Sequence, residues 1–503
     1  MPDKITNTYL HQLQAAYYDI GDRGIRVDYD KLKAARRKVF KLIQEQLKIA
    51  CDQWNCKVFI GAANAPSKDD PAYKFCVNLN ATQGDKALLK KLQDIGYHIP
   101  KITKKNEEGE YEQKYSTGEL ALQKMLVENQ FNYPAGDPAI RAILKVRELG
   151  KLSTGYLNAR LLCRIEEGIS NYYFLSTYNV AGTLTGRRGS KRHTFGFGNN
   201  AQNFPKHSSS AGIYRECLIP REGNIFLFVD QVQAEDWPVS ALSCNLNALK
   251  ELRGGIDRHS ALASAIFNQN IPPKSSPQWN ESLHGLHRYL GKKVRHARNY
   301  GMRAKRMSES LAQEGFSVSE PVCKVLLDKA ASIDPTVDTV FHKYVQDELS
   351  NTHMLHTPFG RERMFLGCRP NADNNSLFNE AYAYIPQSTV GDNTGFAVYY
   401  LEEALRTQSS IRPSCFIIQE GHDSIVQDIR AEKSSILQSL QRSIKAFKRS
   451  IRFDNGIEIE IPIEASIGYS FNEEVVIKTF DENGIATAMD KLEAKRAAAQ
   501  VAA

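Results

Sequence analysis

Residues Ile225–Glu235 read IFLFVDQVQAE. The apolar residues Ile225–Val229 are followed directly by the carboxylate of Asp230. A short, wholly apolar run beside a turn is typical of a strand inside a sheet. A second stretch, Cys415–Val426 (CFIIQEGHDSIV), predicts two strands joined by a tight turn at Gly421. Asp is common in turns, so Asp230 and Asp423 are each compatible with a plain turn. If the strands are neighbours, however, the two carboxylates can hold two divalent cations about 4 Å apart.

A third stretch, Arg288–Gly301 (RYLGKKVRHARNYG), carries a regular pattern of basic and aromatic residues. Arg288, Lys292, His296 and Tyr300 recur every four residues, so on a helix they form one stripe. Arginine makes forked contacts to phosphate, and lysine is a compact charge that can donate a proton. The alternative is an ordinary exposed basic face. The order of the three stretches favours a site that binds phosphate and metal.

The overall composition of the chain is compatible with several classes of protein. The 503 residues are 42% hydrophobic and 24% charged with a net charge of +8, which permits a nucleic-acid partner without requiring one. Two to four subdomains are expected at this length. The nine cysteines include no CxxC pair, which predicts reduced thiols. No apolar run reaches the roughly 18 residues of a membrane span, and residues 1–4 do not begin a signal peptide, so a cytoplasmic protein is expected.

Segments with helical and strand-like patterns of apolar residues alternate along the chain. Helices are predicted over 28–56, about 139–163, 257–350 and about 432–450, and strands over 171–229 and the rest of 411–475. The Ala- and Lys-rich segment 491–503 is expected to be a frayed tail.

Five motifs in this order resemble the polymerase region of family A DNA polymerases, the family of bacterial DNA polymerase I. They are Thr183–Arg187 (TLTGR) with Asn200–Pro205 (NAQNFP), which resemble TxTGR and NxQNxP; Asp230–Glu235, which resembles motif A (DxxQxE); Asp257–Ser260 (DRHS); Arg288–Gly301, which resembles motif B; and His422-Asp423, which resembles motif C. The match runs from about residue 20 to residue 478. Five ordered motifs are far more specific than one.

The resemblance implies a role for each matching residue. Asp230 and Asp423 would bind two Mg²⁺ ions, with Mn²⁺ as a substitute, and Lys292 would be the general acid for pyrophosphate. The implied nucleotide-binding residues are Arg288, Lys292, His296, Tyr300, His259, Gln233 and Glu235, with Glu235 as the gate against ribose. The implied DNA-binding residues are Arg187, Asn200, Gln202, Asn203, Gln387 and His422.

The implied fold is the α+β right-hand polymerase fold, with a thumb, a palm built on an antiparallel sheet, and helical fingers. The expected boundaries are an N-terminal segment 1–27, thumb 28–170, palm 171–250, fingers 251–368, palm again 369–480, and a C-terminal tail 481–503. The expected partners are primer–template DNA, dNTPs and a separate exonuclease or processivity factor, with no membrane partner. Few residues precede the thumb-like helix, so no 3′–5′ proofreading is expected, and the location is a bacterial cytoplasm or a phage-infected cell.

Four departures from the family pattern keep alternatives open. Ser424 replaces the Glu of His-Asp-Glu, and His-Asp-Ser resembles single-subunit RNA polymerases. Glu235 and the NxQNxP segment favour DNA synthesis instead. His296 stands at a Phe or Tyr position, Trp237 stands where Arg is usual, and the loop 188–199 is longer than typical. The alternatives are an RNA polymerase or primase, and a DNA-binding scaffold without catalysis.

Overall fold

The structure, a computed structural model, describes residues 4–59, 76–79, 86–105, 111–128, 137–180, 182–206, 208–314, 316, 318–367, 375–407 and 415–502. The chain forms two compact units, each with a hydrophobic core. The first unit comprises residues 1–32, 159–302 and 325–503, and the second comprises residues 33–158 and 303–324. Within the described ranges, no helix has the length and hydropathy needed to cross a membrane.

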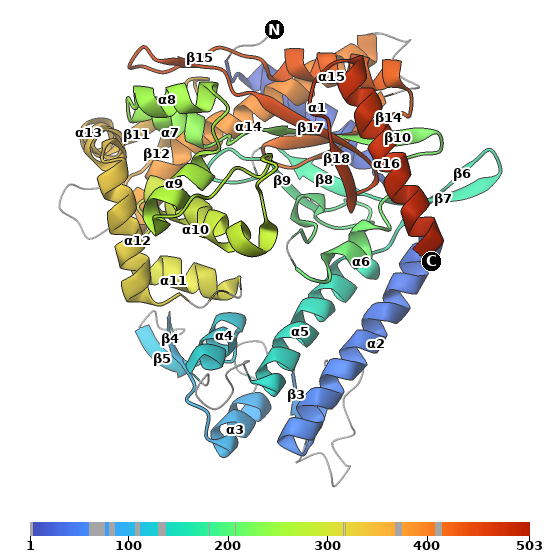
Figure 1. The fold of residues 1–503 in the computed structure, drawn as a ribbon, viewed down its shortest axis with the longest axis vertical. Helices are drawn as coiled ribbons and strands as arrows, with labels where there is room; N and C mark the ends of the chain where they lie inside the picture. The colour runs from blue at the N-terminus through green and yellow to red at the C-terminus, as the bar shows by residue number, and fades with distance from the viewer. Residues whose placement is uncertain are drawn as a thin grey trace. The chain divides into compact units, whose positions relative to one another are not determined.

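A five-stranded antiparallel sheet is the centre of the first unit (Figure 1). Its order is β13 (Cys415–Glu420), β14 (Ser424–Arg430), β10 (Asn224–Gln231), β17 (Ile463–Ser470) and β18 (Glu473–Val476). The predicted strand that ends near Asp230 and the predicted hairpin around Gly421 are therefore both confirmed, and β10 and β14 are direct neighbours.

The two faces of this sheet carry different side chains. Ile225, Leu227 and Val229 of β10 are completely buried, and on the same face Gln427 donates a hydrogen bond of 2.7 Å to Ser443 of α15 (Lys433–Phe447). The other face carries Phe228, whose ring packs edge-on against Phe471 at 5.6 Å. Asp230 follows on this second face, at the end of the strand, because side chains alternate along a strand.

A helical segment follows β10, as predicted for residues 257–350. Its helices are α7 (Asp236–Leu242), α8 (Leu246–Arg253), α9 (Arg258–Phe267), α10 (Glu281–Asn299), α11 (Ala304–Gln313), α12 (Glu320–Ile333), η5 (Val337–His342) and α13 (Lys343–Thr352). Of these, α11 belongs to the second unit, and α12 spans the boundary between residues 324 and 325. The remaining elements of the first unit are α1 (Asn7–Arg23), β1 (Ile25–Val27), β6 (Leu162–Glu166), β7 (Ile169–Phe174), β8 (Ser176–Asn179), β9 (Gly189–Arg192), η4 (Ala201–Asn203), α6 (Ala211–Arg215), β11 (Met354–His356), β12 (Glu362–Met364), β15 (Ile451–Arg452) and β16 (Glu458–Ile459).

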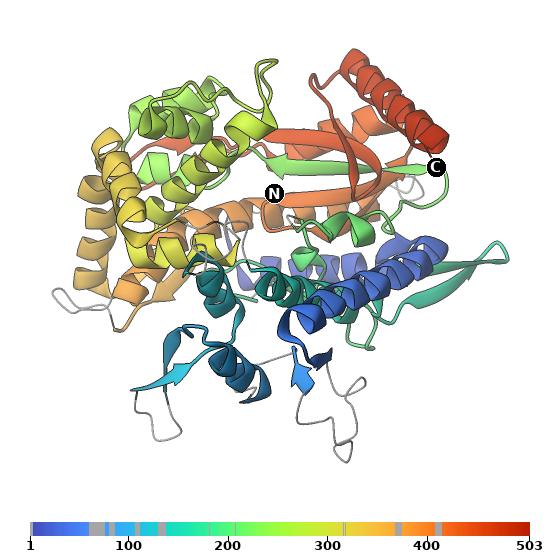
Figure 2. The same cartoon turned by 60° about the horizontal axis from the view of Figure 1, so that its bottom comes forward.

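One long helix, α14 (Asn375–Thr407), has no counterpart in the sequence prediction. It runs alongside the sheet (Figure 2) and contains Pro386. Its polar residues Asp392, Asn393 and Thr394 are completely buried. Proline and buried polar residues weaken the pattern by which an amphipathic helix is recognised, so local periodicity does not find it.

The second unit contains most of the segment expected to be the thumb. The helix predicted over 28–56 is α2 (Tyr29–Trp54), with Leu32 and Val39 buried. The other elements are β2 (Lys57–Phe59), β3 (Cys76–Asn78), α3 (Lys86–Ile95), β4 (Lys101–Lys105), β5 (Tyr111–Tyr115), α4 (Glu119–Glu128), α5 (Pro138–Leu152) and η3 (Ser153–Leu157). The helix predicted over 139–163 is too long at its C-terminal end, because Leu162 already begins β6.

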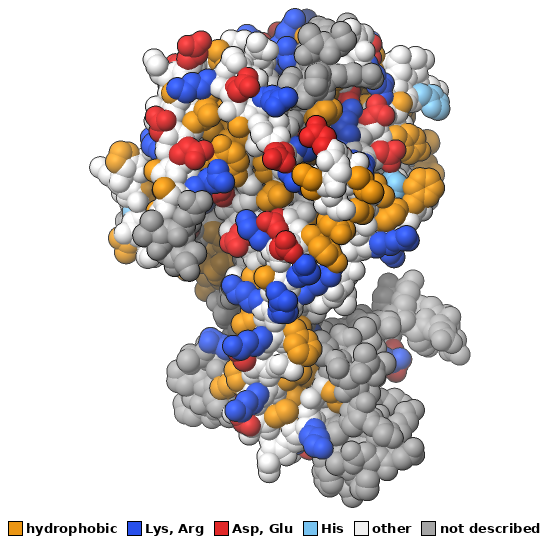
Figure 3. Space-filling view, turned by 90° about the vertical axis from the view of Figure 1, so that its right-hand side faces the viewer, with side chains coloured by type: hydrophobic (Ala, Val, Ile, Leu, Met, Phe, Trp, Pro, Cys, Tyr) orange, Lys and Arg blue, Asp and Glu red, His pale blue; other side chains and the backbone are white. Residues whose placement is uncertain are grey.

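On the side shown in Figure 3, Lys and Arg side chains lie among acidic and apolar ones over the upper part of the view. Just below the middle of the view, several Lys and Arg side chains lie near one another.

The prediction of a frayed C-terminal end is wrong. Residues Glu482–Ala502 form helix α16. Ile485, Ala488 and Leu492, spaced three and four residues apart, are buried in the core of the first unit. The Tyr469 hydroxyl also donates a hydrogen bond of 2.9 Å to Glu493. This apolar stripe, which ends at Leu492, anchors the helix. The expected thumb, palm and fingers boundaries stay a prediction.

Candidate active site

Two carboxylates meet at the end of β10. Asp230 lies directly opposite Ser424, the first residue of β14. Asp423 precedes Ser424 in the turn, and its carbonyl oxygen accepts a hydrogen bond of 3.1 Å from the Gln231 N–H. Both aspartates line a cavity of about 480 Å³. The strand-end geometry expected from the sequence is therefore present.

The electrostatics of this pair call for positive charge. Burial, followed by the carboxylates of Asp423 and Glu464, holds the pKa of Asp230 well above its usual range. Burial likewise raises the pKa of Asp423. Among the described residues, none donates a hydrogen bond to the Asp230 carboxylate. Lys206 and Lys292 offset only part of this effect. Close carboxylates of this kind fit divalent cations, because bound cations are the strongest local charges that proteins use.

The donor set is incomplete as it stands. Within the described ranges, no three His, Cys, Asp or Glu side chains are gathered tightly enough to hold a metal ion by themselves. The two aspartates fit a cation that takes its remaining ligands from a bound substrate and water, as Mg²⁺ often does.

The predicted stripe on α10 faces the same cavity. Arg288, Lys292 and His296 line it together with Asp230 and Asp423. The Nε of Arg288 donates a hydrogen bond of 2.6 Å to Asp257. Asp257 also caps α9 by accepting from the backbone N–H groups of His259 and Ser260, at 3.1 and 3.2 Å. Among the described residues, Lys292 has no hydrogen bond or ion pair, so its ammonium is available to a ligand.

The helices α9 and α10 pack closely because of a glycine. A Cβ at Gly291 would lie 2.6 Å from the His259 carbonyl oxygen. This approach brings the His259 ring to 5.9 Å from the His296 ring. Burial lowers the pKa of His259 to about 3, with Arg295 and His296 adding to the effect. The Nδ1 of His259 is buried without a hydrogen-bond partner among the described residues, so the ring is neutral and has an unused polar atom.

Glu235 joins three of the predicted motifs. Arg187 and the Tyr300 hydroxyl both donate hydrogen bonds to its carboxylate, and the Nδ1 of His296 lies 3.7 Å away. Burial, then Glu235, holds the pKa of Tyr300 well above its usual range. The side chain expected to discriminate the sugar therefore lies against His296 of α10 and Tyr300, the residue that follows α10, both of which are expected beside the nucleotide. None of the motifs by itself predicts these contacts.

Gln233 also lines the cavity, but both ends of its amide are engaged. Its Oε1 accepts from the Arg258 N–H at 2.9 Å, and its Nε2 donates to the Ile256 carbonyl at 2.8 Å. Its φ of +49° is rare for a residue with a side chain. In this structure Gln233 holds the start of α9, and its nucleotide contact stays a prediction.

The expected DNA-binding residues lie around the hairpin β13–β14 and α14. Asn200 caps η4 by accepting from the N–H groups of Gln202 and Asn203, at 2.9 and 3.2 Å. Gln202 donates a hydrogen bond of 2.9 Å to Glu420, at the end of β13. Gln387 is half-buried on α14, beside Ser388, whose hydroxyl donates to the Thr185 carbonyl. The structure thus ties the TLTGR and NAQNFP segments to the palm-like sheet and to α14.

His422 occupies a strained position in the hairpin. Its φ is +73°, and its Nδ1 is buried without a hydrogen-bond partner among the described residues. The carbonyl of His422 accepts from Thr394 at 2.9 Å. Burial, then Arg187 and Lys206, lowers the pKa of His422 to about 4. Strain and an unused buried nitrogen are features found at functional sites.

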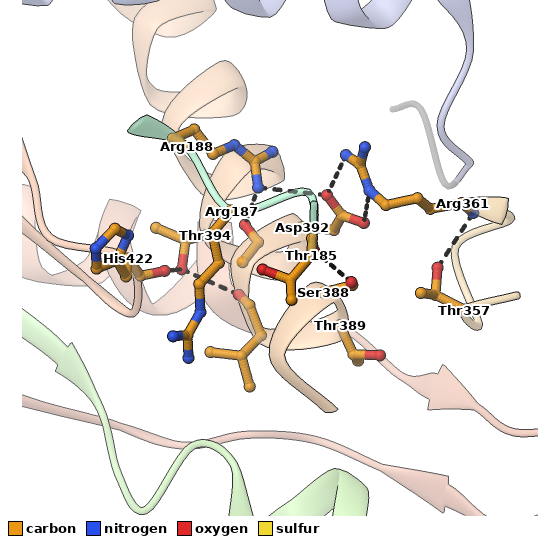
Figure 4. A network of polar contacts seen from close by, with 12 residues as sticks. Thr185, Arg187, Arg188, Thr357, Arg361, Ser388, Thr389, Asp392, Thr394 and His422 are labelled. Carbon is orange, nitrogen blue, oxygen red and sulfur yellow. Dashed lines mark hydrogen bonds and ion pairs between the residues drawn. The ribbon is translucent and has the colours of Figure 1, made fainter. Parts of the chain in front are cut away.

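A buried ion network that the sequence did not predict holds the Arg187 segment (Figure 4). Arg187 and Arg188 point in opposite directions. Asp392 of α14 accepts two hydrogen bonds from Arg361, at 3.0 and 2.7 Å, and pairs with Arg188 at 3.3 Å. Gly395 leaves room for this, because a Cβ there would lie 1.8 Å from the Arg188 guanidinium. No sequence signal links these residues, which are up to about 200 positions apart.

A second unpredicted network lies behind motif A. Asp236 is buried, with Arg295 at 3.4 Å and Arg258 at 3.8 Å. Burial works to raise the pKa of Asp236, but the two arginines outweigh it and hold the pKa below its usual value. Trp237, whose role the sequence left open, is buried and donates a hydrogen bond of 3.1 Å to the Val232 carbonyl. Both residues therefore fix the motif A turn.

The long loop 188–199 is structured and contains strand β9. β9 pairs with β8, and His193 of this loop pairs with Asp22 of α1 at 2.8 Å. The Gly198 N–H donates to the Arg160 carbonyl at 2.7 Å. The tip residue Phe195 remains 75% exposed. Most of the insertion is thus explained by packing, and contact of its tip with a duplex stays a prediction.

Comparison with known proteins adds to this geometry. The family model for DNA polymerase family A matches residues 73–473. DNA polymerase I of Helicobacter pylori is 24% identical over 356 residues, 70% of this chain and 34% of that protein. The DNA polymerase of Bacillus phage SP01 is 22% identical over 407 residues, 73% of this chain and 40% of that protein. The chain therefore spans about a third to two fifths of the relatives' length.

A solved structure has the same fold. It is the POL domain of Pol1 from M. smegmatis in complex with DNA primer-template and dNTP. The TM-score is 0.67 at 19% identity, and the alignment covers 92% of this chain and 70% of that chain. The α+β right-hand polymerase fold expected from the sequence is thereby confirmed. Since the family model spans most of its length, the chain belongs to DNA polymerase family A.

Proposed function

We propose that this chain is a DNA-templated, primer-dependent DNA polymerase that uses two divalent cations. One observation carries the proposal: the Asp230 and Asp423 carboxylates share a single cavity with Arg288 and Lys292 of α10. Negative charge at one wall suits cations, and positive charge at the other suits a triphosphate. Phosphoryl transfer needs both, held in line with the attacking oxygen.

Asp230 and Asp423 would hold the cations, Mg²⁺ by preference with Mn²⁺ as a substitute. When bound there, the cations would supply neutralisation of the triphosphate and a lowered pKa for the primer 3′-hydroxyl. Four further carboxylates line the same cavity, those of Glu235, Asp236, Asp257 and Glu464.

The residues of α9 and α10 would bind and orient the nucleotide. Arg288, placed by Asp257, and the neutral ring of His259 would contact phosphate oxygens. Lys292 would give a proton to the departing pyrophosphate. Glu235 and His296 would exclude a 2′-hydroxyl, because Glu235 is held against α10 by Tyr300. Tyr300 would lie beside the templating base.

The residues around the hairpin would hold the duplex. These are Arg187, Asn200, Gln202, Asn203, Gln387 and His422. Arg187 forms an ion pair with Glu235, so engaging DNA through Arg187 would compete with that ion pair. Contacts of this kind position the duplex and do not read its sequence.

Extension of a labelled DNA primer on a DNA template, with Mg²⁺ and either dNTPs or rNTPs, tests the proposal. Templated growth with dNTPs alone is the expected result. Growth with rNTPs, or products without a primer, would indicate RNA synthesis. Tight duplex binding without growth would indicate a scaffold. Incubation with a mismatched primer and no dNTPs tests the separate expectation that proofreading is absent, for which shortening of the primer is the contrary result.

A further inference from the structure

Asp230 is flanked by a residue on each side, in one row across three strands. The register pairs Asp230 with Ser424 of β14 and, on its other side, with Glu464 of β17. Residues directly opposite in antiparallel strands share a face of the sheet, with Cβ atoms about 4.5–5.5 Å apart. Ser424, Asp230 and Glu464 therefore point to the same side.

Ser424 occupies the position of the Glu in the His-Asp-Glu motif of DNA polymerase family A. The Ser424 hydroxyl lies 3.5 Å from the Gly421 carbonyl oxygen, within its own turn. On the β14 side, Asp230 consequently has no carboxylate for a neighbour. On the β17 side, the residue directly opposite Asp230 is Glu464.

The Glu464 carboxylate is exposed to the cavity and available. It lines the cavity together with Asp230, Asp423 and Arg288. It has no hydrogen bond or ion pair among the described residues. Glu474, an acidic residue close to it, is instead engaged by Arg215 at 3.2 Å and by Ser466 at 3.1 Å. Glu464, like Asp230, is thus an uncommitted carboxylate among the described residues of this wall.

The charges around Glu464 fit a role towards cations. Its charge acts on Asp230, and it lies near Arg288 and the charges of Asp257 and Glu474. Arg288 is already paired with Asp257 at 2.6 Å. Asp230, Asp423 and Glu464 therefore share the negative charge at this wall, and Lys206 and Lys292 are nearby positive charges that act on Asp230.

We propose that Glu464 supplies the third carboxylate of the cation site, in place of the motif C Glu that Ser424 lacks. The inference rests on the proposed function and names a residue outside all five motifs. Glu464 would act through a water bound to the cation, since no three described carboxylates are gathered tightly enough to bind one ion directly. It would thereby increase the affinity of the site for divalent cations, because affinity rises with the number of carboxylates.

Titration with Mn²⁺, followed by the loss of the free-ion signal in electron paramagnetic resonance, tests the inference without turnover. Glu464→Gln keeps the size of the side chain and removes its charge. It should weaken Mn²⁺ binding roughly 10- to 100-fold, as loss of a supporting ligand does. Glu474→Gln, the matched control, should leave the affinity unchanged. The double variant Glu464→Gln with Ser424→Glu should recover most of it, since it moves the carboxylate to the other side of Asp230.

The remaining outcomes separate this inference from the proposed function. If Glu464→Gln binds Mn²⁺ like the wild type while Asp230→Asn does not, Glu464 has no such role but the cation site stands. If Glu464→Gln changes only the KM for dNTP, its partner is Arg288 and the inference fails. If Asp230→Asn also binds Mn²⁺ normally, the proposed function itself is contradicted. Thermal melting by circular dichroism checks that each variant is folded.

Discussion

Replacing Asp392 by Asn should destabilise the first unit more than any single exposed ion pair can. The carboxylate of Asp392 and the guanidinium of Arg188 are both completely buried, at 0% exposure. Asp392 also accepts two hydrogen bonds from Arg361. Removing its charge leaves the buried Arg188 guanidinium without its ion-pair partner, which costs about 3–5 kcal/mol. An exposed ion pair contributes only about 0–1 kcal/mol.

Urea unfolding followed by tryptophan fluorescence measures this loss, since Trp237 is buried in the same unit. The midpoint should fall while the slope with denaturant stays constant. Asp347→Asn is the control, because Asp347 pairs with Lys343 at the surface, where the two side chains are 52% and 63% exposed. The control should lower the free energy of unfolding by less than about 1 kcal/mol. If Asp392→Asn also lowers it by less than about 1 kcal/mol, the network does not stabilise the fold as argued.

Three further changes test the site. Asp230→Ala or Asp423→Ala should lower primer extension by at least ~10²-fold with duplex binding retained in a band-shift assay, and near-normal extension would remove the metal assignment. Glu235→Ala should admit ribonucleotides or impair dNTP use, and an unchanged dNTP-to-rNTP ratio and rate would exclude the gate. Burial, opposed by Arg188, raises the pKa of Glu420 to about 7. Between about pH 4.5 and pH 7, Glu420 keeps its proton in the folded protein but loses it in the unfolded chain. The contribution of Glu420 to the free energy of unfolding is therefore full below about pH 4.5 and is lost as the pH rises through 7. Glu420→Gln should flatten that decline in urea melts between pH 5 and 8; a parallel decline in both proteins would contradict the assignment.

The parts of the site that sequence reasoning predicted are those with a local signal. An apolar run that ends on Asp230 predicts a strand end, and a four-residue period from Arg288 predicts a stripe on a helix. Both signals lie within about fifteen residues, and the structure has both elements. The hairpin around Gly421 is equally local.

The parts that were missed depend on contacts between distant segments. Asp236 forms its ion pairs with Arg258 and Arg295, which come from two other helices. Helix α14 was missed because Pro386 and buried polar residues such as Asp392 obscure its period. Their burial is tolerated because partners from elsewhere satisfy them, and those partners have no local trace in the sequence.

The register of the central sheet is the most consequential of these long-range features. A strand order of β14, β10, β17 places two residues beside Asp230, yet only one of them belongs to a motif. Motif comparison therefore finds the Ser424 departure and treats it as a loss. The register gives Asp230 a second neighbour, Glu464, at the same level of the sheet. A carboxylate lost from one strand can thus be offset from the strand on the other side, which is why the Ser424 departure is compatible with a working cation site.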